Sequence, residues 1–350
     1  MPLIKKALFL KTKHIGDSIV LTSAIAALPD DYVVDVLCFR DSAAIFVMNP
    51  RVRKVLIVPR HLKGLARLRQ DWKNLHYMRE QHYDLLAQFS DDWRGAFISR
   101  ILNVKTSVAR ASKKRPAFWA NAFTHIAKVT STPRPAAEQD VDLLRRVHVY
   151  NKPIAPAYKL QVPQSDLEKV EGWLAQSKEV GRQKKLVVIH AAARWKFKGL
   201  PHQAWAKVID ALMMRGLEVV LSGAGADREF NNELAHLCEQ APRLVDGFSL
   251  SESAALVQLS DLVISIDSMS IHLASAVQTP VVAIFGPTDN LVWAPWKVPH
   301  KIVALGSADS PSFSCRPCGL DGCAGSKISQ CLYEITPQQI LSAVDGLING

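Results

Sequence analysis

The chain has 350 residues with 48% hydrophobic and 21% charged side chains, the composition of an ordinary globular protein of about two domains. This excludes collagen, coiled coils and wholesale disorder; no apolar run approaches the ~18 residues of a membrane-spanning helix, and the N-terminus lacks the apolar core and cleavage site of a signal peptide. The net charge of +11 is uneven, because residues 1–160 carry 27 Lys and Arg against 13 Asp and Glu, whereas residues 161–350 carry 16 against 19.

Apolar runs and helical stretches alternate along the first half of the chain. Helices are predicted at residues 18–28, where Pro29 ends the helix, and at residues 61–82. Strands are predicted at residues 6–12, 32–38, 55–58 and 84–89. This alternation is typical of parallel sheets with crossover helices.

Residues 147–164 interrupt the alternation, because Pro153, Pro156 and Pro163 forbid a continuous helix and favour an extended connector. The pattern then resumes, with helices predicted at residues 165–176, 203–215, 227–240, 250–259 and 269–277, and strands at residues 186–190, 217–222, 262–266 and 281–285. We therefore predict two Rossmann-like α/β domains, residues 1–155 and 156–350. Ligands of such sheets bind beyond the carboxyl ends of the strands, where the loops are expected to carry the chemistry.

The loop after the first strand contains His14, Gly16 and Asp17. Glycine allows close approach of the backbone to a ligand. Asp17 precedes the predicted helix, where capping is the favoured role, but at the end of a strand it could also act as a general base. The spaced glycines of a dinucleotide fingerprint and a P-loop motif are both absent from the sequence, which disfavours a dehydrogenase and a P-loop nucleotidase.

Two loops of the second half are suited to an anion. Residues 190–201 follow a strand with small residues and then Arg194, Lys196 and Lys198, so a phosphate site and a solvated basic loop are equally favoured. Residues 265–272 end a strand with Asp267 and serines and then enter a helix, whose free amides would face an anion. The Gly-Pro-Thr-Asp sequence at 286–289 is explained by turn formation alone.

Four cysteines near the C-terminus have the spacing C-x2-C-x4-C-x7-C. They are Cys315, Cys318, Cys323 and Cys331. Because the sequence shows no secretory signal, reduced thiols or a structural zinc site are expected before disulfides.

Together these motifs resemble glycosyltransferase family 9, the lipopolysaccharide heptosyltransferases with the GT-B fold, in which two Rossmann-like domains face a central cleft. The resemblance rests on His-Ile-Gly-Asp at 14–17, Arg-Trp-Lys-Phe-Lys at 194–198 and, most specifically, the continuous stretch 267–289. Within the family, the opening at 13–17, the Arg-x-x-x-Lys loop and the terminal cysteines are most similar to the heptosyltransferase III type.

The resemblance implies an inverting transfer of heptose from ADP-heptose, held by the C-terminal domain, to an acceptor held by the N-terminal domain. No cofactor is implied for the chemistry. Asp17 matches the family's general base, with His14 and Gly16 in the acceptor-side loop, and Lys198 matches the basic residue that faces the donor diphosphate, with Arg194 close by. The segments matched to the diphosphate and sugar and to the adenine and ribose are Asp267, Ser268, Met269, Ser270 and His272, and Gly247, Phe248, Ser249 and Leu250.

One departure concerns the donor, because Ser268 and Met269 stand where the family often has Thr-Gly. The loss of a flexible glycine amide predicts either a different closure of this loop or a different nucleotide sugar. A family 9 transferase with another donor or acceptor is therefore the alternative function.

The basic first half is expected either to bind an anionic surface or only to keep the protein soluble. The resemblance implies a lipopolysaccharide core or lipid A-linked acceptor and a cytoplasmic, peripheral location on the inner membrane. The cations of residues 51–79 and 105–115 would bind that membrane, with Trp72, Trp93 and Phe118 among the aromatic residues beside them. A nucleic-acid-binding protein is a distant third reading, since no nucleic-acid motif is present.

Overall fold

The computed structural model describes residues 4–60, 62–128, 132–151, 157–176, 184–306 and 311–348. Its contacts divide the chain into two compact units, Met1–Gln161 (unit 1) and Val162–Gly350 (unit 2). This boundary lies within the predicted connector 147–164, six residues beyond the predicted division after residue 155; residues 152–156 of the connector lie outside the described residues.

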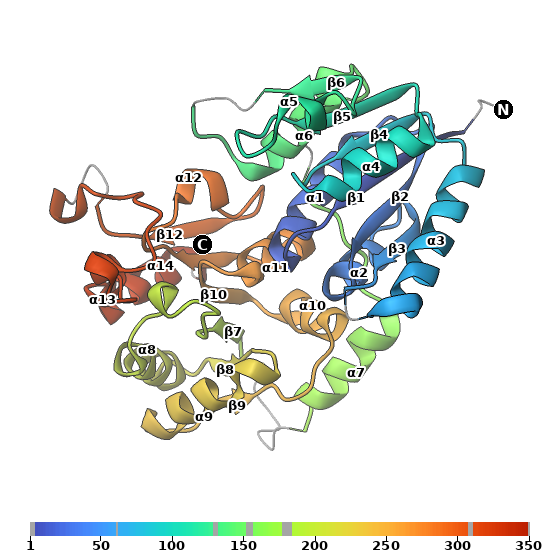
Figure 1. Cartoon of the computed structure of the whole chain (residues 1–350). Helices are drawn as coiled ribbons and strands as arrows, with labels where there is room; N and C mark the ends of the chain where they lie inside the picture. Colours follow the sequence, from blue (N-terminus) through green and yellow to red (C-terminus); the bar gives the residue numbers. More distant parts are fainter. Residues whose placement is uncertain are drawn as a thin grey trace. The chain divides into compact units, whose positions relative to one another are not determined.

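Unit 1 contains a six-stranded sheet of order β3-β2-β1-β4-β5-β6, in which every strand pair is parallel (Figure 1). Its strands are β1 Lys5–Lys11, β2 Tyr32–Phe39, β3 Val52–Val58, β4 Leu85–Gln88, β5 Thr106–Arg110 and β6 His125–Ala127. Its helices are α1 Ile15–Ala27, α2 Ala43–Val47, α3 Gly64–Glu80, α4 Trp93–Leu102, α5 Ala117–Ala120 and α6 Ala136–Arg146. The predicted helix 61–82 is α3, and His61 lies outside the described residues.

Strand β1 shows why this sheet is buried on both faces. Its central residues are apolar without interruption, and alternate side chains point to opposite faces. Leu8 and Leu10 pack in one core cluster with Met78 of α3 and Ile98 of α4. Phe9, on the opposite face, is also fully buried. Helices are therefore required on both sides of the sheet, as Figure 1 shows.

Unit 2 contains a second six-stranded parallel sheet, of order β12-β11-β10-β7-β8-β9. Its strands are β7 Leu186–His190, β8 Glu218–Leu221, β9 Arg243–Leu244, β10 Leu262–Ile266, β11 Val281–Ile284 and β12 His300–Val303. Its helices are α7 Gln164–Leu174, α8 His202–Met214, α9 Arg228–Leu237, α10 Leu250–Leu259, α11 Met269–Val277, α12 Asn290–Trp293, α13 Gln330–Tyr333 and α14 Pro337–Ile348. The predicted bounds of β7, β10, α10 and α11 are confirmed residue for residue.

Each sheet has one point at which its strand order reverses. In unit 1 this point lies between β1 and β4, and in unit 2 it lies between β7 and β10. The loops after such a pair of strands diverge to opposite faces of the sheet and leave a crevice at its carboxyl edge. The loops after β1, β4, β7 and β10 are therefore where a ligand of each sheet is expected.

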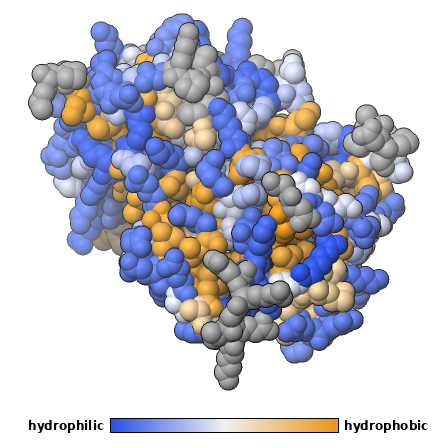
Figure 2. Space-filling view, turned by 180° about the vertical axis from the view of Figure 1, so that it is seen from behind, coloured by the Kyte–Doolittle hydropathy of each residue, from blue (hydrophilic) through white to orange (hydrophobic). Residues whose placement is uncertain are grey.

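The surface is not uniformly polar. Hydrophobic residues, orange in Figure 2, form patches among hydrophilic ones on the face shown. Throughout the described ranges, however, no helix combines the length and the apolar character needed to cross a membrane.

Candidate active site

In unit 1 the loops after β1 and β4 are fastened to each other. The amide of Thr12 donates to the hydroxyl of Ser90 (2.8 Å), and the Thr12 hydroxyl donates to the carboxylate of Asp92. Lys13 and Asp91 form a more exposed ion pair of 3.6 Å. Two loops that are far apart in the sequence are thus held together at the point where the strand order of the sheet reverses.

Asp17 lies inside a helix rather than before it. Helix α1 begins at Ile15, three residues earlier than predicted, because the Ser18 amide already donates to the His14 carbonyl (3.1 Å). His14 is the N-cap residue and its side chain makes no capping bond, so the prediction that Asp17 caps the helix is wrong. Gly16 and Asp17 occupy the first turn instead.

The position of Asp17 suits a proton acceptor. Its side chain is partly exposed, and the structure gives its carboxylate no hydrogen bond or ion pair among the residues it describes. The free amides of the first helical turn favour a negative charge at this place. A carboxylate that is accessible and not engaged by the protein can accept a proton from a hydroxyl group.

A buried ion pair supports this loop from within unit 1. Lys11, the last residue of β1, lies 2.9 Å from Asp140 of α6, and both side chains are almost completely buried. Arg110 of β5 donates to the second carboxylate oxygen of Asp140 (2.6 Å). Two cations on one carboxylate compensate the cost of burying these charges. The sequence analysis missed this group, although a lysine that ends an apolar strand was a signal for it.

In unit 2 the predicted donor residues meet at the reversal point. Lys198, at the end of a short 3₁₀ turn after β7, donates to the carboxylate of Asp267 after β10 at 2.5 Å. Both side chains are partly exposed, so the pair is accessible to a ligand. The structure thus brings together two residues that are 69 positions apart in the sequence.

The segment after Asp267 forms the start of α11. Ser268 is the N-cap residue, and its hydroxyl accepts from the Ser270 amide (3.2 Å) and lies 3.0 Å from the Ser265 hydroxyl. Met269 is the first helical residue. His272 is buried, with its ring centre 6.0 Å from that of Trp293. The predicted helix start at the end of this strand is confirmed, and it presents amides to the same loop region as Lys198.

Arg194 lies in the same loop as Lys198. Its guanidinium lies 5.5 Å from the centre of the Trp195 ring, on an exposed part of the loop. Arg194 therefore adds positive charge to the exposed part of this loop, whereas Lys198 is oriented by Asp267.

His190, the last residue of β7, was not assigned a role from the sequence. Its Nδ1 lies 3.4 Å from the Ser222 hydroxyl at the end of β8, and burial lowers the pKa of the His190 imidazole, an effect that nearby Asp227 opposes. A Cβ at Gly223 would lie 2.9 Å from the Cβ of Asp227, so this loop needs glycine there. His190 thus adds a neutral hydrogen-bonding group at the carboxyl edge of the sheet.

The predicted adenine segment is a rigid turn into α10. Gly247 has φ +75°, which favours glycine. The Ser249 hydroxyl accepts from the Glu252 amide (3.2 Å) while the Glu252 carboxylate accepts from the Ser249 amide (2.6 Å), a capping box. The Phe248 ring packs edge-on against Trp173 of α7 (5.2 Å), and Leu250 begins the helix. This geometry holds the segment in one conformation.

The structure does not support a zinc site at the cysteines. Residues 311–348 are all described, and across the described residues no group of three or more His, Cys, Asp or Glu side chains is arranged to hold a metal ion. Cys331 is buried, which raises the pKa of its thiol to about 11, whereas Cys315 and Cys323 are exposed. Cys315, Cys318 and Cys323 lie near enough to Cys331 to add to this rise in its pKa, yet no three of the four are arranged as metal ligands among the described residues.

The cysteine segment has a different structural role. Arg316 donates to the carbonyls of Gly286 (2.5 Å) and Leu305, and the Gly319 amide donates to the Pro287 carbonyl (2.9 Å). This segment therefore covers the Gly-Pro-Thr-Asp turn that follows β11.

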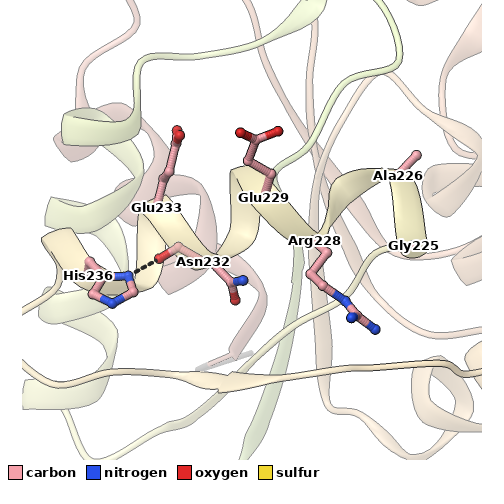
Figure 3. A pocket seen from close by; sticks show the side chains of 7 residues that line it. All are labelled: Gly225, Ala226, Arg228, Glu229, Asn232, Glu233 and His236. Atoms are coloured by element: carbon pink, nitrogen blue, oxygen red, sulfur yellow. Dashed lines mark hydrogen bonds between the residues drawn. The ribbon is translucent and has the colours of Figure 1, made fainter.

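An open hollow of about 500 Å³ lies along α9 (Figure 3). Its lining comes from α9 and the turn before it, and His236 lies 2.6 Å from the carbonyl of Asn232 within the same helix. None of the predicted site residues lines it. The hollow and the candidate site therefore share no residues.

A family model described as glycosyltransferase family 9 (heptosyltransferase) matches residues 72–319 of the chain. The chain belongs to glycosyltransferase family 9. The matched range contains Lys198, residues 247–250 and Asp267 of this family 9 chain, and it begins beyond Asp17.

Individual proteins similar to this chain are named as heptosyltransferases, in agreement with the family model. The Escherichia coli protein named lipopolysaccharide heptosyltransferase 3 is 29% identical over 291 residues, covering 80% of this chain and 83% of that protein. The structure of the E. coli ADP-heptose lipopolysaccharide heptosyltransferase II has a TM-score of 0.78 at 19% identity and covers 98% of both chains. E. coli heptosyltransferase WaaC, solved with ADP-2-deoxy-2-fluoro heptose, has a TM-score of 0.65 at 18% identity and covers 97% of this chain and 99% of its own. These two structures confirm the GT-B fold class.

Proposed function

We propose that this family 9 glycosyltransferase moves heptose from ADP-heptose to the inner core of lipopolysaccharide, with inversion at the anomeric carbon. The observation that carries the proposal is the Lys198–Asp267 ion pair at the reversal point of the unit 2 sheet. The names of the relatives, a lipopolysaccharide heptosyltransferase and an ADP-heptose transferase, supply the chemical class of donor and acceptor.

Unit 2 is proposed to bind the donor. Lys198 and Arg194 place positive charge, and the amides of Ser268 and Met269 at the start of α11 place hydrogen-bond donors, where a diphosphate needs both. Asp267 orients Lys198, and His272 supports the loop from its buried position. The adenosine is assigned to the turn at 247–250, whose glycine leaves room for a flat ring.

Asp17 is proposed as the general base. It takes the proton of the acceptor hydroxyl while the hydroxyl oxygen forms its bond to the anomeric carbon. The bond from that carbon to the diphosphate oxygen breaks with its electron pair, and ADP departs. Lys198 stabilises the negative charge that develops on the leaving group. A single displacement of this kind inverts the anomeric centre and needs no covalent intermediate.

The basic character of unit 1 fits the proposed acceptor. Lipopolysaccharide core and lipid A-linked glycolipids carry anionic groups, which the excess of Lys and Arg in residues 1–160 attracts. His14 and Gly16 lie beside Asp17 at the start of α1 and are assigned to the acceptor side. The proposed location is the cytoplasmic face of the inner membrane, where such an acceptor is available.

A second candidate function is a family 9 transferase with another nucleotide sugar. Met269 occupies the first helical position of α11, where the sequence departs from the Thr-Gly of the family. A side chain at that position narrows the space beside the diphosphate, which favours a different fit of the sugar.

Thermal-shift titration with ADP and UDP separates these candidates, because a ligand that binds only the folded protein raises its melting temperature. We expect ADP to raise the temperature and UDP to leave it unchanged, and transfer from ADP-heptose to an inner-core acceptor to follow. A shift with UDP alone would support the second candidate. Absence of a shift with both nucleotides would contradict the donor site. In Lys198→Ala, the rise in melting temperature caused by ADP should be much smaller than in the wild type.

A further inference from the structure

Unit 1 exposes an apolar surface bordered by cations on α3 and α4. Its apolar side chains are strongly exposed, with Leu65 at 75%, Leu68 at 63%, Trp72 at 64% and, on α4, Phe97 at 64%. A hollow of about 940 Å³ lies along the two helices. We call the four residues and this hollow the α3–α4 surface.

The exposure follows from how α3 is attached. Its C-terminal half is anchored, because Met78 is buried and the side chain of Asn74 donates to the Ile57 carbonyl (2.9 Å). Leu65, Leu68 and Trp72 recur at helical spacing on one face of the N-terminal half. This face does not contribute to the core of the described unit, so burial within unit 1 does not explain it.

The charges around the surface have one predominant sign. Exposed Arg67, Arg69 and Lys73 lie on α3 between the apolar residues. The acid on this part of the helix, Asp71, is already paired with Arg94 of α4 at 2.8 Å and with Arg67 at 3.8 Å. The surface therefore offers apolar side chains together with the positive charges of Arg69 and Lys73, for which the described residues show no acidic partner.

We propose that the α3–α4 surface docks on an anionic lipid bilayer, with its apolar side chains inserted at the level of the headgroups and its cations against lipid phosphates. Aromatic and aliphatic residues interleaved with Lys and Arg on an exposed helix have this chemistry. The inference deepens the membrane location given with the proposed function by naming the part of the chain responsible. It does not depend on the identity of the donor sugar.

Charge argues against a second copy as the occupant. A symmetric contact would place Arg67, Arg69 and Lys73 against the same cations of the other chain. An anionic bilayer accommodates both the exposed apolar side chains and the cations of this surface. Trp72, the aromatic residue of α3 on this surface, is 64% exposed, as insertion at the headgroups requires.

The test is co-sedimentation of the full-length protein with vesicles of phosphatidylethanolamine and phosphatidylglycerol, compared with vesicles of phosphatidylcholine alone. We expect binding to the anionic vesicles that is at least about tenfold stronger, and weaker by about tenfold in Leu68→Ser/Trp72→Ser and in Arg69→Gln/Lys73→Gln. The matched controls are Val47→Ser/Met214→Ser, whose apolar side chains are 71% and 76% exposed elsewhere, and Lys207→Gln/Lys301→Gln. Both controls should bind as the wild type does.

Three results would overturn the proposal. These are no preference for anionic vesicles, unchanged binding of Leu68→Ser/Trp72→Ser, and self-association that this variant abolishes while its vesicle binding persists. Melting temperatures within about 2 °C of the wild type show that the variants are folded. Transfer to a water-soluble acceptor without acyl chains, measured in parallel, should be unchanged in Leu68→Ser/Trp72→Ser. Failure of transfer in the wild type would contradict the proposed function, whereas the vesicle result tests only the docking surface.

Discussion

Lys198 and Asp267 form a 2.5 Å ion pair that joins the loops after β7 and β10, the two strands between which the order of the unit 2 sheet reverses. The pair holds a cation in place before any ligand arrives, so little reorganisation is needed when a diphosphate binds. Each loop taken alone is also explained as a solvated loop or a helix start. The ion pair joins the two loops into one candidate site.

Lys198→Ala is expected to weaken ADP binding by about ten- to a hundredfold, since a hydrogen bond to a charged group contributes ~1.5–3 kcal/mol. Isothermal titration calorimetry measures the change. Lys196→Ala is the matched control, because Lys196 lies in the same 3₁₀ turn and is exposed; its affinity should stay within about twofold of the wild type. Equal affinity of Lys198→Ala and the wild type would remove Lys198 from the donor site.

Asp17→Asn is expected to lower kcat by about 10²- to 10⁴-fold, because it keeps the shape of the side chain but removes the proton acceptor. ADP affinity and melting temperature should not change. Asp30→Asn serves as the control, since Asp30 is an exposed carboxylate in the same unit. Initial rates at saturating donor and acceptor decide the matter, and a fully active Asp17→Asn enzyme would require a different base.

Asp35→Ala is expected to destabilise unit 1 by about 2–4 kcal/mol, because it leaves the buried Tyr83 hydroxyl and the partly exposed Arg53 guanidinium without their acceptor. The Asp35 carboxylate is buried and accepts from Arg53 (2.6 and 3.0 Å), Tyr77 (3.1 Å) and Tyr83 (2.7 Å). Burial and the bond to Asp35 raise the pKa of Tyr83, so this phenol remains a donor at neutral pH.

Urea unfolding followed by fluorescence measures this loss of stability. The matched substitution is Asp71→Ala, which removes a more exposed ion pair with Arg94 and should cost no more than about 1 kcal/mol. Equal midpoints for Asp35→Ala and Asp71→Ala would show that the buried carboxylate does not stabilise the unit.

Glu252 should make part of the stability of unit 2 dependent on pH. Hydrogen bonds from Lys169 and from the Ser249 amide lower the pKa of the Glu252 carboxyl from 4.5 to about 2. A lowered pKa means that the ionised carboxylate stabilises the folded state above about pH 4.5, and that this contribution is lost as the pH falls towards 2.

Glu252→Gln is therefore expected to cost about 1 kcal/mol at pH 7, the usual contribution of a helix cap, since Lys169 is too exposed to add much more. The difference from the wild type should shrink between pH 5 and pH 3. Urea titrations at several pH values in this range measure it. A difference in stability that stays constant with pH would contradict this prediction, because the loss would then not come from the charge of Glu252.

Local information in the sequence was enough for the order of elements and for the loops that matter. Continuous apolar runs predicted β7 and β10, and the serine-bearing start of α11 predicted its first residue. These features depend on residues a few positions apart, and hydrophobic periodicity and capping act over that range. The parallel sheets then followed from the alternation of strands and helices.

Contacts between distant residues were decided only in the tertiary structure. Lys11 meets Asp140 across 129 positions, and Lys198 meets Asp267 across 69. Sequence periodicity carries no information on such pairs, because their distance depends on which strands become neighbours.

Two predictions from the sequence were wrong or unsupported. Asp17 was expected to cap α1, but the turn beginning at His14 placed it inside the helix. The spacing of the four cysteines permits a metal site, but no three of them are arranged as metal ligands in the part of the chain that the structure describes. The sequence by itself determined the elements, the parallel topology and which loops hold the polar groups; the packing of strands against one another decided which of those groups meet, because burial and electrostatic pairing act through space rather than along the chain.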